Sequence, residues 1–201
     1  MELRPYQEEA IHAVESALSR GIRRQLIQLP TGCGKTVIFC SVLSQMNLPC
    51  MVVAHRQELL SQAKETALKW KSTQNPKIYG EEPIDDSQLL ISSIQLATQP
   101  KRLEFLKQFS PKVIVFDEAH HAPASSYRLL LDELDFDSNG VLLLGVTATP
   151  TRLDGLGMNN VFTDLVYSKN IVDMIELGYL CPVKADLIRT GIDLSQFDDK
   201  P

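Results

Sequence analysis

Short apolar runs alternate along the chain with segments whose apolar residues recur every three or four positions. Runs such as VIVF and VLLL have no polar alternation, which predicts strands buried on both faces. The helical segments between them separate these strands in sequence. The predicted strands are Arg24–Leu29, Cys50–His55, Gln88–Ile94, Lys112–Phe116, Val141–Val146 and Pro182–Ile188.

Apolar residues at helical spacing between Tyr6 and Leu18 predict a first helix, with Pro5 in its first turn and Gly21 at its C-terminal cap. Strands that alternate with helices predict an α/β fold with a mostly parallel central sheet covered on both faces. The further predicted helices are Val37–Met46, Leu59–Trp70, Arg102–Phe109, Tyr127–Leu134 and Ile171–Leu177, the last capped by Asn170 and stopped by Gly178.

Three predicted strands are followed at once by polar or glycine-rich sequence. These segments come after Leu29, Phe116 and Val146. Because ligands of such sheets bind at the carboxyl ends of the strands, we expect the three segments to converge on one site.

The first of these segments is PTGCGKT, Pro30–Thr36, which fits the phosphate-binding pattern GxxxxGK[ST] except that Leu29 replaces the first glycine. Glycines let successive backbone N–H groups face one phosphate, and the following helix terminus favours the anion. Lys35 is expected to reach the β- and γ-phosphates, and the Thr36 hydroxyl to bind Mg²⁺. The alternative is a tight strand–helix turn without a ligand. Cys33 is interpreted as a small residue at a variable position.

The second segment begins with two carboxylates, Asp117 and Glu118, directly after a buried strand. A nucleotide bound with Mg²⁺ needs a carboxylate for the metal and a base for the attacking water, and we assign these roles to Asp117 and Glu118. The alternative is a solvated turn. His120 is expected to act as a polar relay to a neighbouring strand end, and His121 remains undecided, since EAHH lacks the spacing of a zinc helix.

Composition limits the class of protein without naming it. With 201 residues, a net charge of −5 and 44% hydrophobic residues, the chain fits one globular domain. The acidic balance is unusual for a dedicated nucleic-acid-binding domain, so nucleic acid would meet a local patch. The cysteines form no close pair, no secretory signal is visible and no apolar run reaches the ~18 residues of a membrane span. These features predict a cytoplasmic protein with free thiols and no membrane contact.

Together, PTGCGKT, DEAH (Asp117–His120) and TATP (Thr147–Pro150) resemble the first core motifs of superfamily 2 helicases. LRPYQEEA, VVAHRQEL and SSIQ resemble that group's adenine-recognition motif, its motif Ia and a following nucleic-acid segment. The chain is most similar to the DEAH-type group that includes XPB, RadD and the motor subunits of restriction enzymes. The resemblance implies a RecA-like three-layer sandwich that binds ATP and Mg²⁺.

The resemblance also implies residue roles. Arg4 and Gln7 would read adenine, and the nucleotide would be held by Pro30, Thr31, Gly32, Cys33, Gly34, Lys35 and Thr36. His120, Thr147 and Thr149 would couple hydrolysis to movement, and Arg56 and Gln95 would contact nucleic acid. Three of these assignments have structural alternatives: a surface charge for Arg56, a strand end for Gln95 and a polar helix face for Gln7.

The same resemblance implies a second RecA-like domain. Residues 1–188 are expected to form the ATP-binding domain, and residues 189–201 the start of a hinge. The chain would then be an excised first domain or a gene fragment. Without the arginine fingers of a second domain, worth about 10³–10⁵ in rate in related systems, it should bind nucleotide weakly, hydrolyse it slowly and not unwind duplex.

We expect the ATP-binding half of a helicase or translocase that moves on DNA or, less in keeping with the resemblance, RNA. One alternative is a P-loop small-molecule phosphotransferase, although the sequence has no arginine-rich lid. The other is a non-catalytic nucleotide-binding module, which the presence of Lys35, Asp117 and Glu118 disfavours.

Overall fold

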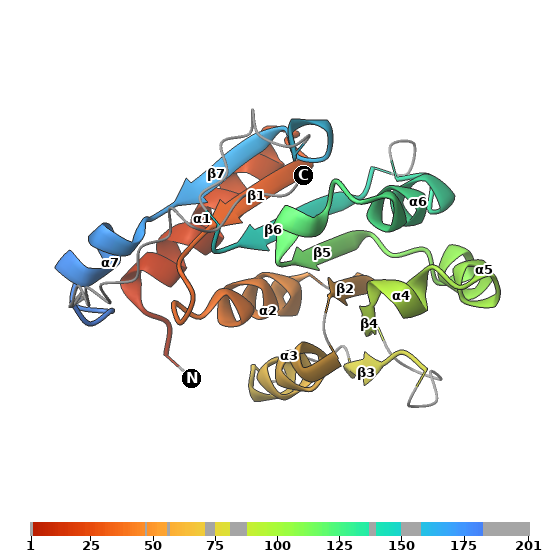
Figure 1. Cartoon of the computed structure of the whole chain (residues 1–201), viewed down its shortest axis with the longest axis horizontal. Coiled ribbons are helices and arrows are strands. Elements are labelled where there is room, and N and C mark those ends of the chain that lie inside the picture. Colours follow the sequence, from red (N-terminus) through yellow and green to blue (C-terminus); the bar gives the residue numbers. More distant parts are fainter. Residues whose placement is uncertain are drawn as a thin grey trace, which may run out of the picture.

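The computed structural model describes residues 2–46, 48–55, 57–70, 75–80, 88–136, 140–149 and 158–182. Its centre is a seven-stranded sheet in the order β3-β4-β2-β5-β6-β1-β7, in which each pairing is parallel (Figure 1). The strands are β1 (Arg24–Gln28), β2 (Cys50–Ala54), β3 (Lys77–Ile78), β4 (Leu89–Ser93), β5 (Val113–Asp117), β6 (Leu142–Thr147) and β7 (Asp164–Ser168).

Five of the predicted strands are confirmed to within one residue at each end, and every residue of β2, β4, β5 and β6 is buried. The edge strands β3 and β7 were not predicted. β3 has two residues, and β7 is mostly accessible, so neither carries the continuous apolar signal of a central strand. The predicted last strand and hinge, residues 183–201, lie outside the described residues.

One layer of helices covers one face of the sheet, and its apolar side chains form a single core with that face. This layer is made of α1 (Pro5–Ser19), α2 (Lys35–Gln45), α3 (Gln57–Lys69) and α7 (Ile171–Glu176). The predicted caps are confirmed: Gly21 follows α1 with φ +83°, and the Asn170 side chain accepts the backbone N–H groups of Val172 and Asp173. Helix α2 begins two residues earlier than predicted, at Lys35.

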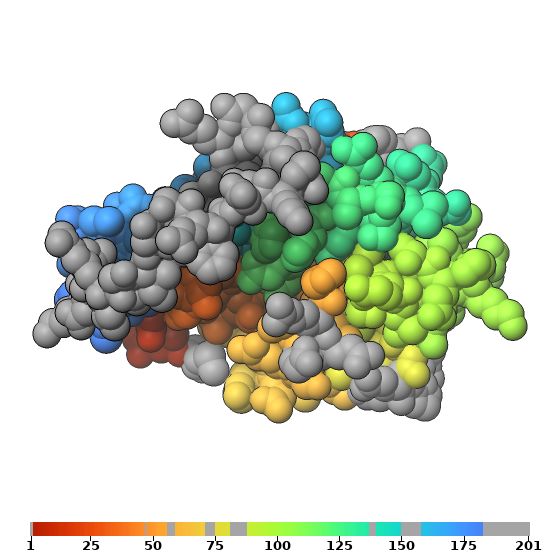
Figure 2. Space-filling model, viewed as in Figure 1, coloured from red at the N-terminus to blue at the C-terminus, as the bar shows by residue number. Residues whose placement is uncertain are grey.

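The second layer packs a separate core against the other face. It consists of α4 (Ile94–Ala97), α5 (Pro100–Phe109), α6 (Ser125–Glu133) and the 3-10 turns η1 (Ala119–His121) and η2 (Met158–Asn160). In Figure 2 the side chains of α5 and α6 form the green surface at one end of the molecule. The two layers with the sheet between them confirm the three-layer sandwich.

The register of the central strands aligns their carboxyl ends. Asp117 of β5 pairs with Val146 of β6, and Thr147 of β6 pairs with Gln28 of β1. The Leu29 N–H then donates a hydrogen bond of 2.9 Å to the Thr147 carbonyl. The segments that follow β1, β5 and β6 therefore start side by side at one edge of the sheet, as the sequence predicted.

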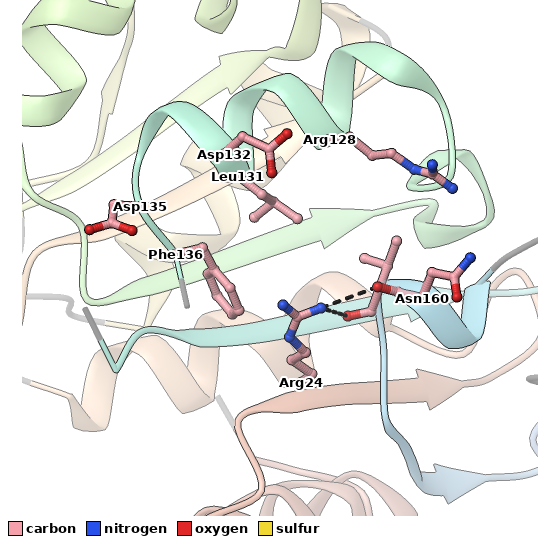
Figure 3. A pocket seen from close by; sticks show the side chains of 8 residues that line it. Arg24, Arg128, Leu131, Asp132, Asp135, Phe136 and Asn160 are labelled. Atoms are coloured by element: carbon pink, nitrogen blue, oxygen red, sulfur yellow. Dashed lines mark hydrogen bonds between the residues drawn. The ribbon is translucent and has the colours of Figure 1, made fainter. Parts of the chain in front are cut away.

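A cavity of about 480 Å³ lies at the opposite edge, at the amino ends of β1, β6 and β7 (Figure 3). Arg24 donates to the carbonyl groups of Asn160 and Val161, at 3.2 and 3.5 Å, and its guanidinium carbon lies 5.1 Å from the centre of the Phe136 ring. These contacts fix the loop before β7 to the sheet. Because the phosphate-binding sequence follows the other end of β1, this cavity is remote from the predicted site.

Candidate nucleotide-binding site

The glycine-rich loop adopts a backbone that its glycines make possible. Gly32 and Gly34 have φ values of +84° and +68°, in the left-handed region that glycine tolerates best. A Cβ atom added to Gly34 would lie 2.6 Å from the Nε2 atom of Gln7, so the end of the Gln7 side chain would have to move. The loop leads into α2 at Lys35, whose buried amine donates to the Leu29 carbonyl at 3.3 Å.

The acidic pair lies where β5 turns away from the sheet. Asp117 is buried and is the last residue of β5, whereas the sequence predicted that this strand ends one residue earlier, at Phe116. Glu118 has φ +52° and ψ +54°, a left-handed conformation that is strained for a residue with a Cβ atom. Its N–H donates to the Asp117 Oδ1 atom at 3.0 Å, which holds the two carboxyl groups at one turn.

The strand register places the glycine-rich loop and the acidic turn at the same edge of the sheet, one strand apart. Burial raises the pKa of the Asp117 carboxyl, and the charge of Glu118 raises it further. The Glu118 N–H and the positive charge of Lys35 act in the opposite direction. The Lys35 charge thus acts on the Asp117 carboxyl, in keeping with the roles expected for a phosphate-binding lysine and a metal-binding carboxylate.

His120 connects the acidic turn to the end of β6. Its Nδ1 atom lies 3.3 Å from the Thr147 hydroxyl and 3.5 Å from the Glu118 Oε2 atom. The Thr147 hydroxyl also accepts the N–H of Thr149 at 3.2 Å. The three residues expected to couple hydrolysis to movement thus form a chain of polar contacts, of which only His120 touches Glu118 directly.

A stack of imidazole rings extends from this point to the end of β2, and the sequence did not predict it. The centroid of the His121 ring lies 4.1 Å from that of His120 and 4.4 Å from that of His55. The stack borders a cavity of about 410 Å³ lined by Thr31, His55, Leu59, Glu118, His120, His121, Ala148 and Thr149. His121, undecided from the sequence, therefore joins the segment after β2 to the acidic turn.

The N-terminal segment forms the other side of the glycine-rich loop. The Arg4 N–H donates to the Gln7 Oε1 atom at 3.0 Å, and the Tyr6 hydroxyl donates to the Cys33 carbonyl at 2.9 Å. Gln7 is only 5% exposed and completes the capping box of α1, so it is buried rather than solvated. A cavity of about 270 Å³ lies here, lined by Glu2, Arg4, Gln7, Gly32, Gly34 and Val37.

Some contributions to the site carry no sequence signal. Tyr6 was assigned only to the apolar stripe of α1, because periodicity reports its burial and not the destination of its hydroxyl. Tyr179 was given no role, yet its ring lies 4.7 Å from the ring of Tyr6. No spacing rule links positions so far apart in the chain.

Of the two residues assigned to nucleic acid, the structure describes Gln95, which lies apart from the nucleotide residues. Gln95 is exposed in α4, directly after β4, rather than at a strand end as the alternative had it. It shares the carboxyl edge of the sheet with the nucleotide site, but β2 separates β4 from β5. Arg56 lies outside the described residues.

The donors near the loop fit a magnesium ion that is shared with phosphates. The Thr36 hydroxyl and the Asp117 carboxylate supply oxygen atoms, which Mg²⁺ prefers. Within the described ranges, no group of three or more histidine, cysteine, aspartate or glutamate residues is arranged to hold a metal alone. The part of the chain that the structure describes also has no helix long and apolar enough to cross a membrane.

A left-handed glycine loop and a buried acidic strand end, side by side on a parallel sheet, define a P-loop nucleotide-binding domain of RecA-like architecture. The family model for the type III restriction enzyme res subunit matches residues 1–152. The chain belongs to this family, and its fold and motifs are those of the first RecA-like domain of superfamily 2 proteins.

Comparison with individual proteins agrees with this class. The chain is 33% identical to the putative ATP-dependent helicase IRC3 of Saccharomyces cerevisiae, over 96% of this chain and 30% of that protein. It is 34% identical to the DNA 3'-5' translocase XPB2 of Sulfurisphaera tokodaii, over 77% of this chain and 32% of the relative. The chain thus spans about a third of the length of these relatives.

A solved structure supports the fold independently. The UvsW helicase from bacteriophage T4 matches 84% of this chain and 61% of its own, with a TM-score of 0.64 and 18% identity. At that identity the match shows the fold alone, and it confirms the three-layer arrangement expected from the sequence.

Proposed function

We propose that this chain is the ATP-binding half of an ATP-dependent helicase or translocase, which couples ATP hydrolysis to movement on nucleic acid. The observation that carries the proposal is the alignment of the carboxyl ends of β1, which leads to Lys35, and β5, which ends at Asp117, at one edge of the sheet. In this proposal the glycine-rich loop binds the phosphates, Lys35 contacts the β- and γ-phosphates, and Thr36 and Asp117 hold Mg²⁺. When bound, Mg²⁺ neutralises charge on the phosphate oxygens.

Glu118 is proposed as the base that accepts a proton from the attacking water. Its side chain is about one-third accessible, and it projects beside the cavity that Thr31 and Thr149 also line. His120 lies between Glu118 and Thr147, so a change at the γ-phosphate that moves Glu118 is passed to the end of β6. This contact supports the proposed coupling of hydrolysis to movement through His120, Thr147 and Thr149.

We propose DNA as the track, in preference to RNA. The support is the similarity to a relative named a DNA translocase, together with the exposed Gln95 on the sheet edge that also carries the nucleotide site. Arg56 is proposed as a second contact. The track would cross the carboxyl edge of β4 and β2, where His55 connects it to the acidic turn through the imidazole stack.

We propose that a second RecA-like domain of the same protein completes the site, with residues 1–188 as the first domain and residues 189–201 as the start of the hinge. The matched region makes up only about a third of each relative's length. Beside the glycine-rich loop, Pro30, Ala148 and Ile171 line a cavity of about 400 Å³, and α7 exposes Ile171 and Val172 by half or more. An apolar surface next to a nucleotide site suits a domain that closes over it.

The cysteines support a reducing compartment, and we propose the cytoplasm. Cys33, Cys40 and Cys50 are buried and form no disulfide among the described residues. Burial, with a contribution from the Asp117 charge, raises the pKa of Cys40 to about 12, so this thiol stays protonated and unreactive.

Replacement of the proposed base tests the function. Glu118→Gln should retain ATP binding and lower single-turnover ATP hydrolysis by about 10²–10⁴-fold, because the amide cannot accept the proton. The matched control is Glu15→Gln on the exposed face of α1, which should change neither. Each protein is assayed with and without single-stranded DNA and RNA of the same length. Unchanged hydrolysis in Glu118→Gln, or ATP binding that is lost together with turnover, would remove Glu118 from this role.

A further inference from the structure

The chain returns to the nucleotide site after α7. Tyr179 lies three residues beyond the end of α7, and the Met174 carbonyl accepts the N–H groups of Tyr179 and Leu180, at 2.9 and 3.1 Å. These hydrogen bonds fix the direction of the chain as it leaves the helix. Leu180 reaches the loop itself, since its Cδ2 atom would lie 3.8 Å from a Cβ atom added to Gly32.

The ring of Tyr179 contacts Arg4 and Tyr6, which belong to the N-terminal segment of the site. It packs edge-on against Tyr6, with ring centroids 4.7 Å apart and an interplanar angle of 64°. The Arg4 guanidinium carbon lies 5.4 Å from the centre of the Tyr179 ring, within the range of a cation–π interaction. Arg4 also points a guanidinium nitrogen toward the Tyr6 hydroxyl, at 3.4 Å.

These contacts matter because Arg4 is exposed. A free arginine side chain samples many rotamers and loses that freedom when it binds a ligand. A partner that holds the guanidinium in advance reduces this loss and strengthens binding without touching the ligand. Arg4 lines the cavity shared with Gln7 and the glycine-rich loop, whereas Tyr179 does not line it.

We infer that Tyr179 is a positioning residue for recognition of the nucleotide base: its ring holds the Arg4 guanidinium beside the cavity where Arg4 and Gln7 meet the base. The inference rests on the proposed function, because it requires that the glycine-rich loop binds the phosphates of the same nucleotide. It makes base recognition depend on two segments about 175 positions apart in the chain, Arg4 and Tyr179.

The same contacts provide a second way in which Tyr179 can affect ligand binding. Tyr6 touches the Tyr179 ring and donates to the Cys33 carbonyl, so a loss at Tyr179 that travelled through Tyr6 would disturb the phosphate loop. The two routes predict different results for a ligand that has phosphates but no base. Inorganic tripolyphosphate is such a ligand.

Calorimetric titration of the full 201-residue chain with ATP and with tripolyphosphate, each with Mg²⁺, separates the routes. Tyr179→Ala should weaken ATP binding about fivefold, the value expected for one exposed cation–π contact, and leave tripolyphosphate binding unchanged. Tyr179→Phe keeps the ring and should bind ATP as the wild type does. Leu177→Ala, an exposed change on the same segment, is the matched control.

The Arg4→Ala background completes the test. Because Tyr179 acts through Arg4, Tyr179→Ala should cause no further loss of ATP affinity in a chain that already carries Arg4→Ala. Equal losses for ATP and tripolyphosphate, or additive losses in the double variant, would overturn the inference. Lys35→Ala distinguishes this failure from a failure of the proposed function: if it leaves both ligands bound as before, the phosphate-loop assignment falls and the role of Tyr179 falls with it.

Discussion

Gly145, in the middle of β6, lies where the sheet comes closest to the acidic turn. A Cβ atom added there would lie 2.5 and 2.6 Å from the Cζ and Cε1 atoms of Phe162, and 2.9 Å from the Cβ atom of Ala119. Phe162 and Ala119 are fully buried, and Ala119 directly follows Glu118. Gly145 does not have a positive φ. A glycine is therefore needed here because there is no room for a side chain, and not because of the backbone conformation.

Gly145→Ala is therefore expected to overpack this contact. The Phe162 ring must retreat by about 1 Å to reach an ordinary carbon–carbon separation of about 3.5–4 Å. Overpacking of a buried contact costs about 1–3 kcal/mol, and the smaller freedom of alanine in the unfolded chain returns about 0.4–1 kcal/mol. The net loss in the free energy of unfolding is thus about 1–2 kcal/mol, measurable from urea denaturation.

A second substitution tests whether Phe162 is the cause. Phe162→Leu shortens the side chain at the point of the clash, and alone it should destabilise the protein by leaving a cavity. In the double variant the added methyl group fills part of that cavity, so the combined loss should be at least about 1 kcal/mol smaller than the sum of the single losses. Strict additivity, or a Gly145→Ala protein as stable as the wild type, would refute the packing argument.

Two further predictions concern stability. The pKa of Asp117 is raised in the folded protein by burial and by the charge of Glu118, so the ionised form costs stability above that pKa. Asp117→Asn should accordingly raise the urea midpoint at neutral pH, and the gain over the wild type should shrink as the pH falls through the folded pKa; a gain that is independent of pH would contradict this cause. Asn170→Ala removes the acceptor of two N–H groups at the start of α7, at 2.7 and 3.0 Å, and should cost about 1 kcal/mol, whereas Asn170→Ser should keep most of the cap. Equal midpoints for the alanine and serine variants would argue against the capping role.

The central sheet was predictable because burial on both faces leaves a direct mark on the sequence. Strands β5 and β6 have no polar residue before their last positions, Asp117 and Thr147, which are polar. Parallel pairing then requires those polar residues to meet at one edge. Strand β7 could not be predicted in this way, because its side chains are largely accessible. It pairs with β1, which is distant in the sequence.

Contacts between segments distant in sequence were not predictable. The imidazole stack joins His55 to His121 across two strand ends, and Tyr179 reaches Arg4 from the far end of the chain. Both contacts depend on how the layers pack, which no local pattern encodes. The family resemblance supplied roles for residues inside its motifs, and so it was silent on Tyr179, which lies outside them.

The acidic turn shows why residues without chemistry are as necessary to the site as the acids. If β5 continued straight, the Glu118 carboxyl group would point away from that of Asp117. The left-handed backbone at Glu118 prevents this, at a cost of about 1–2 kcal/mol. The N–H of Glu118 recovers part of that cost by donating to Asp117, and the turn then brings Ala119 down onto the sheet. There is room for Ala119 only because position 145 has no side chain. The placement of the proposed base therefore depends on two of the smallest residues in the chain, Ala119 and Gly145, and a larger side chain at either position acts on the carboxylates through the backbone of the turn.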